Sequence, residues 1–256
     1  MTPRLFDLSG KVAVVTGGNG GIGLGMAEGI ASCGASIVIA GRNADKAQAA
    51  LEAIGRLGVQ ARFVAADVTR KADCQSLVAQ TLEAFGRLDI LVNNAGTSIR
   101  KMPQEFTEDE WHHVLDTNLT SAFLCSQAAY PAMKQAGGGK MINIGSMMSL
   151  FGAPFATPYA ASKGGIVQMT RALATAWAPD NIQVNAVLPG WIDTALTQRA
   201  REQVNDLHMH VERRTPMNRW GVPRDMSGVA AFLASPASDF VTGTAIPVDG
   251  GFSTAI

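Results

Sequence analysis

Residues Lys11–Gly23 read KVAVVTGGNGGIG, and this stretch decides the fold. The run up to Thr16 has the β-branched, apolar composition of a buried strand, and the glycines after it open a helix. Glycine lets the main chain approach a ligand closely, and a helix N-terminus attracts anions. The spacing T-G-x-x-x-G-x-G is looser than the G-x-G-x-x-G fingerprint, and a lone glycine-rich turn can be purely structural. At the first strand-to-helix turn of a parallel sheet, it predicts a dinucleotide pyrophosphate site.

Outward from this stretch, short apolar strands alternate with longer helical segments. The expected strands are Lys11–Thr16, Ser36–Ala40, Gln60–Ala66, Leu88–Asn93, Lys140–Gly145, Ile182–Val187 and Thr244–Val248. The expected helices are Gly21–Cys33, Asn43–Leu57, Arg70–Phe85, Thr107–Met133, Tyr159–Ala178 and Pro223–Ala234. Strands that are apolar almost throughout belong to parallel sheets covered on both faces. The pattern predicts a single α/β domain over residues 1–256, a doubly wound parallel sheet of the Rossmann type with about seven strands.

The composition excludes several functional classes. The chain of 256 residues has 21 Lys and Arg against 21 Asp and Glu, so its net charge is zero. Without a basic field, binding to nucleic acid or to a membrane surface is not expected. Charged residues make up 16% of the chain, against about 25% in an average soluble domain, which suggests surface buried in an oligomer.

The N-terminus and the cysteines indicate a cytoplasmic location. Residues Met1–Lys11 lack the apolar core of a secretion signal. Cys33, Cys74 and Cys125 are widely spaced in helical stretches and form no C-x-x-C motif. Buried thiols of this kind are typical of a reducing cytosol.

The end of the second strand indicates which dinucleotide is bound. An NAD site usually has an acidic residue there, which binds the ribose 2′-hydroxyl. This chain has Gly41, Arg42 and Asn43 instead. A guanidinium at this place can hold a 2′-phosphate, although a solvated surface arginine is the alternative.

Tyr159 and Lys163 form the candidate acid–base pair. They lie in the first turns of a helix, and their i, i+4 spacing puts them on one face. A nearby cation and the helix dipole are expected to lower the tyrosine pKa from its ordinary value of about 10. Ser146 ends the fifth strand, where its hydroxyl could bind a substrate oxygen, and Asn118 lies beside an apolar helix stripe. Each candidate has a simpler alternative. Tyr159 and Lys163 could be an ordinary surface pair, Ser146 a turn-forming serine, and Asn118 an amide bonded to nearby main chain.

These motifs recur in one protein family, together with others along the chain. The further motifs are Asp67–Val68, Asn93–Gly96 (NNAG), Pro189–Gly190 with Thr194, Arg219–Gly221 (RWG) and Val248–Gly251 (VDGG). From about Leu8 to Phe252 the chain resembles the short-chain dehydrogenase/reductase family. The resemblance implies hydride transfer between a nicotinamide cofactor and a carbonyl carbon, so the chain is expected to be an NAD(P)-dependent oxidoreductase that interconverts a secondary alcohol and a ketone.

The resemblance also implies roles for individual residues. The expected catalytic tetrad is Asn118, Ser146, Tyr159 and Lys163. Tyr159 would donate the proton in reduction, and Ser146 would position and polarise the oxygen. Lys163 would hold the cofactor ribose and lower the pKa of Tyr159, and Asn118 would bind a water linking Lys163 to solvent. The expected cofactor-binding residues are Gly17, Asn19, Gly20, Gly21, Ile22, Gly23, Arg42, Asn43, Asp67, Val68, Asn94, Ala95, Gly96, Tyr159, Lys163, Pro189, Gly190, Ile192 and Thr194.

One departure from the family pattern bears on the cofactor. Many NADP-dependent relatives have a basic residue just before the second glycine of the turn, where this chain has Gly20. The expected preference for NADP(H) therefore rests on Arg42, and NAD(H) remains possible. The family usually forms tetramers through its long central helices and C-terminal strand, so a homotetramer is expected.

The segment from about 190 to 222 has no strand, is polar, and is expected to be a substrate lid. Its arginines could meet a carboxylate, although solvated charge is the simpler role for most of them. The expected substrate-contacting residues are Ser146, Met148, Phe155, Tyr159 and Trp191. The apolar members favour a hydrophobic or cyclic ketone or a 3-oxoacyl thioester. Residues 146–149 and 219–223 instead resemble members that oxidise sugars and sugar acids, such as gluconate 5-dehydrogenases, so a polyol, sugar or sugar acid is the preferred prediction.

Other classes of function fit the sequence less well. A dinucleotide-sensing protein without catalysis typically lacks the tyrosine or the lysine, and this chain has both. A serine hydrolase needs G-x-S-x-G and a histidine partner, whereas Ser146 has no such context. His208, His210 and Glu212 could ligate a metal in principle, but the helical i, i+2 spacing turns the histidines apart, so no metal is expected.

Overall fold

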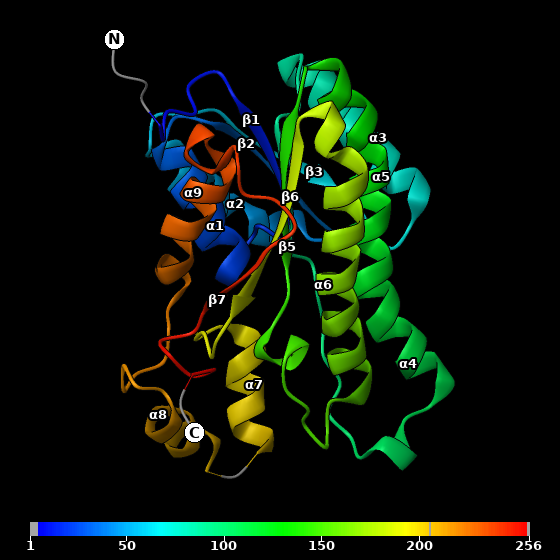
Figure 1. Cartoon of the computed structure of the whole chain (residues 1–256), viewed down its shortest axis with the longest axis vertical. Coiled ribbons are helices and arrows are strands. Elements are labelled where there is room, and N and C mark those ends of the chain that lie inside the picture. The colour runs from blue at the N-terminus through cyan, green and yellow to red at the C-terminus, as the bar shows by residue number, and fades with distance from the viewer. Residues whose placement is uncertain (1–4, 205, 255–256) are drawn as a thin grey trace.

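The computed structural model describes residues 5–204 and 206–254, whose frame is one seven-stranded parallel sheet (Figure 1). The strands are β1 (Val12–Thr16), β2 (Ser36–Gly41), β3 (Ala61–Ala65), β4 (Ile90–Asn93), β5 (Gly139–Ile144), β6 (Ile182–Pro189) and β7 (Ala245–Val248). Their order across the sheet is β3-β2-β1-β4-β5-β6-β7. The doubly wound α/β fold expected from the sequence is confirmed, and each expected strand differs from the observed one by at most a few residues at its ends.

Helices cover both faces of this sheet. The helices are α1 (Gly21–Ser32), α2 (Ala44–Gly55), α3 (Lys71–Phe85), α4 (Glu108–Leu115), α5 (Ser121–Gln135), α6 (Thr157–Trp177), α7 (Ala195–Gln203), α8 (Leu207–Arg214) and α9 (Ser227–Ala234). Apolar side chains of α1, α2 and α9 form one buried cluster with the sheet, and those of α3, α5 and α6 form a second (Figure 1). Among the described residues, no helix is long and apolar enough to cross a membrane.

The path of the chain creates a crevice at one edge of the sheet. The chain leaves β1 toward β2 and β3, then returns so that β4 pairs with the other side of β1, with Val15 beside Val92. Because consecutive crossovers run in opposite directions at this point, the loops after β1 and β4 diverge, and a ligand can enter between them. The loop after β5 lies next to them, since β4 pairs with β5. The glycine-rich turn, Asn94–Gly96 and Ser146 thus lie together at the carboxyl ends of β1, β4 and β5.

Two of the expected helices differ from the observed ones in their geometry, and the segment from about 190 to 222 contains two helices, α7 and α8, that were not expected. The single helix expected over Thr107–Met133 is interrupted by a π-helical turn at Asp116–Thr120, although the expected capping box of Thr107 and Glu110 is present. The helix expected to start at Pro223 begins as a 3-10 turn, Pro223–Met226, and becomes α-helical only at Ser227. Hydrophobic periodicity does not distinguish these tighter and wider turns from an α-helix, because they shift the register by about one residue.

Candidate active site

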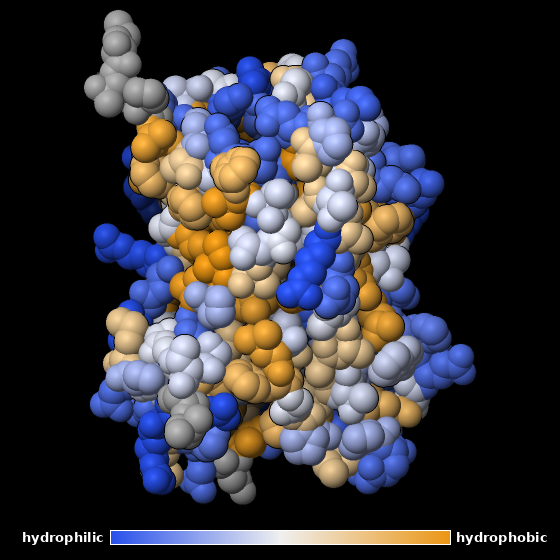
Figure 2. All heavy atoms as spheres, viewed as in Figure 1, coloured by the Kyte–Doolittle hydropathy of each residue, from blue (hydrophilic) through white to orange (hydrophobic). Residues whose placement is uncertain are grey.

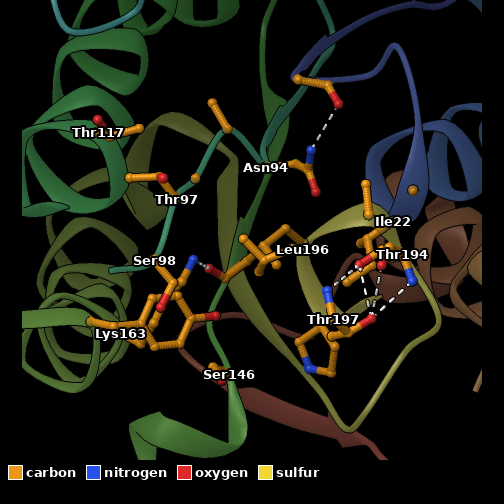
Figure 3. Close-up of a pocket in the computed structure, with 18 of the residues that line it drawn as sticks. Ile22, Asn94, Thr97, Ser98, Thr117, Ser146, Lys163, Thr194, Leu196 and Thr197 are labelled. Carbon is orange, nitrogen blue, oxygen red and sulfur yellow. Dashed lines mark hydrogen bonds between the residues drawn. The ribbon is translucent and has the colours of Figure 1, made fainter. Parts of the chain in front are cut away.

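A cavity of about 730 Å³ opens at the carboxyl ends of the strands. It extends from the glycine-rich turn after β1 to Ser146 and Tyr159, and the first turn of α7 forms part of its wall. Figure 3 shows Ser98, Ser146 and Lys163 at one end, and Ile22, Thr194 and Thr197 toward the other. All expected cofactor-binding and substrate-contacting residues line this cavity except Gly23, which lies beneath the turn. The cavity therefore brings together positions that are spread from Gly17 to Thr197 along the chain.

The shape of the turn after β1 requires glycine at two positions. Gly17 has φ +64°, in the left-handed region. A side chain at Gly23 would come within 2.4 Å of the Asn94 amide nitrogen and 2.6 Å of the Gly17 carbonyl oxygen. The Asn94 side chain donates hydrogen bonds to the carbonyls of Thr16 and Gly17, at 2.9 and 3.1 Å. Asn94 therefore ties the end of β4 to the turn that opens α1, and the α1 N-terminus faces a cavity suited to a pyrophosphate.

The ends of β2 and β3 form the far end of the cavity. Asp67 accepts hydrogen bonds from the main chain and hydroxyl of Thr69, and these, with the nearby Arg42 charge, lower the pKa of its carboxyl despite partial burial. Asn43 caps α2 by accepting from the Lys46 main-chain N–H at 3.0 Å, as expected. Exposed Arg42 and Lys46 line this end of the cavity. The sequence singled out only Arg42. Lys46 was not predicted, because it lies inside a helix and belongs to no motif.

Tyr159 lies near the N-terminus of α6 and faces the Ser146 side of the cavity. Burial raises the pKa of Tyr159, and the hydroxyl of Ser146 and the positive charge of Arg100 act in the opposite direction without outweighing it. The Lys163 ammonium lies 5.7 Å from the centre of the tyrosine ring. The net lowering of the Tyr159 pKa that was expected is therefore not found in this structure, because desolvation of the phenol dominates.

Lys163 is the most deeply buried cation of the site, with 4% of its surface exposed. Its ammonium donates a hydrogen bond of 2.7 Å to the main-chain carbonyl of Ile144, the last residue of β5. Burial lowers the pKa of Lys163 to about 8. A lysine with this pKa can gain or lose a proton near neutral pH, which is the range in which acid–base groups are most effective.

Asn118 occupies the π-helical turn, which turns its side chain into the protein. Its amide oxygen accepts from the Thr97 N–H at 2.7 Å, and its amide nitrogen donates to the Thr97 carbonyl and the Ser162 hydroxyl, each at 3.0 Å. These bonds join the π turn to the loop after β4 and to α6, so the partners of Asn118 are distant in sequence and not the local main chain of its own helix. Such turns often accompany functional sites because they displace one side chain from the helical register.

Arg100 is a cavity residue that the sequence did not reveal. It lies in the loop after β4, lines the cavity, and is close enough to Tyr159 for its charge to act on the phenol. Partial burial lowers the pKa of its guanidinium. Its Nη1 also donates a hydrogen bond of 3.2 Å to the Gln203 side chain of α7. No motif surrounds Arg100 in the sequence, and only the fold brings it beside Tyr159.

Two arginines of the lid segment have partners outside the cavity. Arg201 pairs with Asp193 and lies over the Trp220 ring, with its guanidinium carbon 4.6 Å from the ring centre. Arg214 lies between the rings of Phe252 and Phe151, at 4.4 and 5.2 Å. Neither Arg201 nor Arg214 lines the cavity, and nor do Arg199 and Arg213. Arg100 therefore lines the cavity, whereas these four arginines of the lid segment do not.

The comparisons with known proteins agree with this arrangement. The sequence model of the family described as "Enoyl-(Acyl carrier protein) reductase" matches residues 17–253. The chain is 42% identical over 253 residues to 2-dehydro-3-deoxy-D-gluconate 5-dehydrogenase of Dickeya dadantii, covering 98% of this chain and 99% of that protein. It is 41% identical over 252 residues to 5-keto-D-gluconate 5-reductase of Escherichia coli, covering 98% and 99%.

A solved structure shows the same likeness in three dimensions. The gluconate 5-dehydrogenase of Burkholderia cenocepacia, in complex with NADP and tartrate, is 38% identical and superposes with a TM-score of 0.93, covering 98% of each chain. The likeness therefore extends over nearly the whole chain. This chain therefore belongs to the short-chain dehydrogenase/reductase family.

Proposed function

We propose that this protein is an NADP(H)-dependent oxidoreductase that interconverts a secondary alcohol and a ketone in a sugar acid. One observation carries the choice of substrate: Arg100 lies beside Tyr159, and Asp67, at the far end, is the single carboxylate among the described residues that line the cavity. A cavity whose catalytic end has a cation and no anion favours a negatively charged substrate. Arginine binds a carboxylate through parallel hydrogen bonds, which would also orient the sugar chain.

The chain's own side chains supply the proton chemistry. A bound nicotinamide provides or accepts the hydride. In reduction, Tyr159 gives its phenolic proton to the carbonyl oxygen as that oxygen becomes a hydroxyl, and Ser146 donates a hydrogen bond to the same oxygen. In oxidation, the tyrosine oxygen takes the hydroxyl proton back. Lys163, whose pKa is about 8, passes protons between this pair and solvent. Both N–H groups of the Asn118 side chain already donate hydrogen bonds. The water that is expected to link Lys163 to solvent would therefore donate to the Asn118 amide oxygen or to a main-chain oxygen.

The relatives support the substrate class and the cofactor. Those reported above act on gluconate derivatives by name, and three solved relatives contain NADP. In this chain, Arg42 and Lys46 provide positive charge where a ribose 2′-phosphate would lie. We therefore propose a preference for NADP(H), with weaker use of NAD(H). A cytoplasmic location, a single domain and a homotetramer remain part of the same proposal.

A second candidate substrate is a hydrophobic or cyclic ketone. Met148, Phe155, Trp191 and Leu196 all line the cavity and would suit an apolar ring. An apolar substrate would not explain why the partly buried guanidinium of Arg100 lines the same cavity. Burying a cation without an anionic partner is unfavourable, so we place the sugar acid first.

A substrate comparison tests the proposal. The nicotinamide absorbance is followed with NADPH and 5-keto-D-gluconate, a 3-oxoacyl ester or a cyclic ketone, and with NADP and D-gluconate or D-glucose. We expect the highest kcat/KM for the sugar acids. Arg100→Met should raise KM for 5-keto-D-gluconate by about 10-fold or more, since a charge-assisted bond is lost, while the neutral ketone is unaffected. Tyr159→Phe should lower kcat for every substrate by at least ~100-fold. A preference above ~10-fold for the 3-oxoacyl ester or cyclic ketone would reject the substrate class but keep the enzyme class.

A further inference from the structure

The Ser149 hydroxyl connects the segments that carry Ser146 and Lys163. Its Oγ accepts a hydrogen bond from the main-chain N–H of Ser146, at 3.2 Å. The same oxygen donates to the main-chain carbonyl of Lys163, at 2.7 Å. One hydroxyl thus joins the 3-10 turn Met147–Ser149 to α6, and Ser149 and Lys163 are 14 residues apart in sequence.

A second bond closes this connection into a ring. The Lys163 ammonium donates to the carbonyl of Ile144, two residues before Ser146, at 2.7 Å. Lys163 is therefore held through its side chain by the end of β5 and through its carbonyl by Ser149. The main-chain N–H of Ser149 also donates to the Ser146 carbonyl, at 2.9 Å. The relative positions of Ser146 and Lys163 depend on this ring.

The surrounding packing holds the Ser149 hydroxyl in place. A side chain at Gly145 would come within 3.0 Å of the Ser149 Oγ and within 2.3 Å of a methyl carbon of Leu188. Ser149 is not among the residues that line the cavity, whereas its neighbours Met147 and Met148 are. Its hydroxyl therefore acts on the site through Ser146 and Lys163 and not by contact with a ligand.

We propose that Ser149 is a positioning residue of the reaction, whose hydroxyl fixes the distance between Ser146 and the Tyr159–Lys163 helix. The inference rests on the proposed roles of Ser146 and Lys163. The proton passes over a hydrogen-bond length, so a small displacement of one partner lowers the rate more than it lowers binding. Ser149 is thus expected to affect kcat more than KM.

The test compares Ser149→Ala with Ser149→Thr, which keeps the hydroxyl. Ser235→Ala is the control, because it removes a fully buried hydroxyl that donates only to the Phe232 carbonyl, at 3.0 Å, at the end of α9. We expect Ser149→Ala to lower kcat by about 10-fold or more with KM and the NADPH Kd within about twofold. Ser149→Thr should recover at least a third of the activity. Ser235→Ala should lower Tm as much as Ser149→Ala does without changing kcat.

Hydrogen–deuterium exchange provides a readout that needs no turnover. The Ser146 amide should exchange faster in Ser149→Ala than in the wild type, because its acceptor is gone, and should be protected again in Ser149→Thr. An unchanged Ser146 amide, a kcat within twofold of wild type, or equal loss in the alanine and threonine variants would overturn the proposal. If the wild type turns over no substrate, the proposed function fails, and the exchange result alone then decides the role of Ser149.

Discussion

Lys163 illustrates how a site residue can oppose stability. An unfolded lysine has a pKa of about 10.4, and burial lowers the pKa of Lys163 to about 8. Between these values the unfolded chain binds more protons than the folded one, so the free energy of unfolding rises with pH across this window. Below about pH 8 the folded protein bears the full cost of burying the cation, of the order of 3 kcal/mol.

We therefore expect Lys163→Met to be inactive and yet more stable. Near neutral pH, the free energy of unfolding of the cofactor-free variant should exceed that of the wild type by about 1–3 kcal/mol, since the bond to Ile144 is lost while the burial cost disappears. The difference should shrink as the pH rises toward about 10. Urea unfolding at several pH values measures it, with the exposed Lys46→Met as control. A variant less stable than the wild type at neutral pH would contradict the argument.

Arg42 and Lys46 determine the expected cofactor preference. Arg42→Ala should weaken NADPH binding by about 10- to 100-fold, the loss of one charge-assisted pair, and Lys46→Ala should weaken it less. NADH affinity should stay within about twofold in both, because NADH has no 2′-phosphate for these side chains to meet. Fluorescence titration with each cofactor measures the effect, and Arg56→Ala, at the exposed end of α2, serves as control. A wild type that already binds NADH more tightly contradicts the assignment.

Motif residues and isolated residues differ in how far the sequence predicts them. Ser146, Tyr159 and Lys163 were predictable, because strand ends and i, i+4 spacing place them locally. Arg100 was not, because its position follows from the loop after β4 meeting α6, a contact between distant parts of the chain. The role of Ser149 was not predictable either, since its two hydrogen bonds exist only after α6 packs against the turn. The sign of the Tyr159 pKa shift was missed for a similar reason, because it depends on burial.

At the scale of elements, the π-helical turn and the lid segment carry the least sequence signal. The π turn between α4 and α5 changes the register by one residue within an otherwise continuous apolar stripe, so the expected single helix was reasonable but wrong there. The segment expected to be a lid contains α7 and α8, short helices with polar outer faces. Their role as a lid remains a prediction.

The hydrogen bond from Arg100 to Gln203 gives that prediction a mechanism. Arginine has several N–H donors, so Arg100 can keep its hydrogen bond to Gln203 while it also binds a substrate carboxylate. Substrate would then hold α7 against the loop after β4. We expect NADP with D-gluconate to slow proteolysis between residues 195 and 214 by about tenfold, as ligand-induced closure does. Gln203→Ala should lose this protection, and Gln198→Ala, on the same helix, should keep it. Equal cleavage rates with and without ligands would count against a lid.

At the scale of the whole molecule, exposed apolar side chains bear on the expected tetramer. Phe123 on α5 is 42% exposed and Phe240, just before β7, is fully exposed. Figure 2 shows apolar side chains gathered on the face over α9 and β7. β7 is also the edge strand of the sheet, pairing with β6 on one side. An exposed edge and large exposed rings invite association, so both surfaces are candidates for contact between copies of this chain.

The two surfaces can be tested separately, because a closed tetramer of identical chains commonly uses more than one self-complementary interface. Light scattering should give a mass of about four times the 26.8 kDa chain for the wild type. Phe123→Glu and Phe240→Glu should each reduce this mass to that of a dimer, because each charge is buried at one interface and leaves the other intact. The double variant should be monomeric. Leu57→Glu, at a 43% exposed apolar position beyond α2, should leave the mass unchanged. A wild type that scatters as a single chain at micromolar concentration would rule out the tetramer, and single variants that keep the full mass would place its interfaces elsewhere.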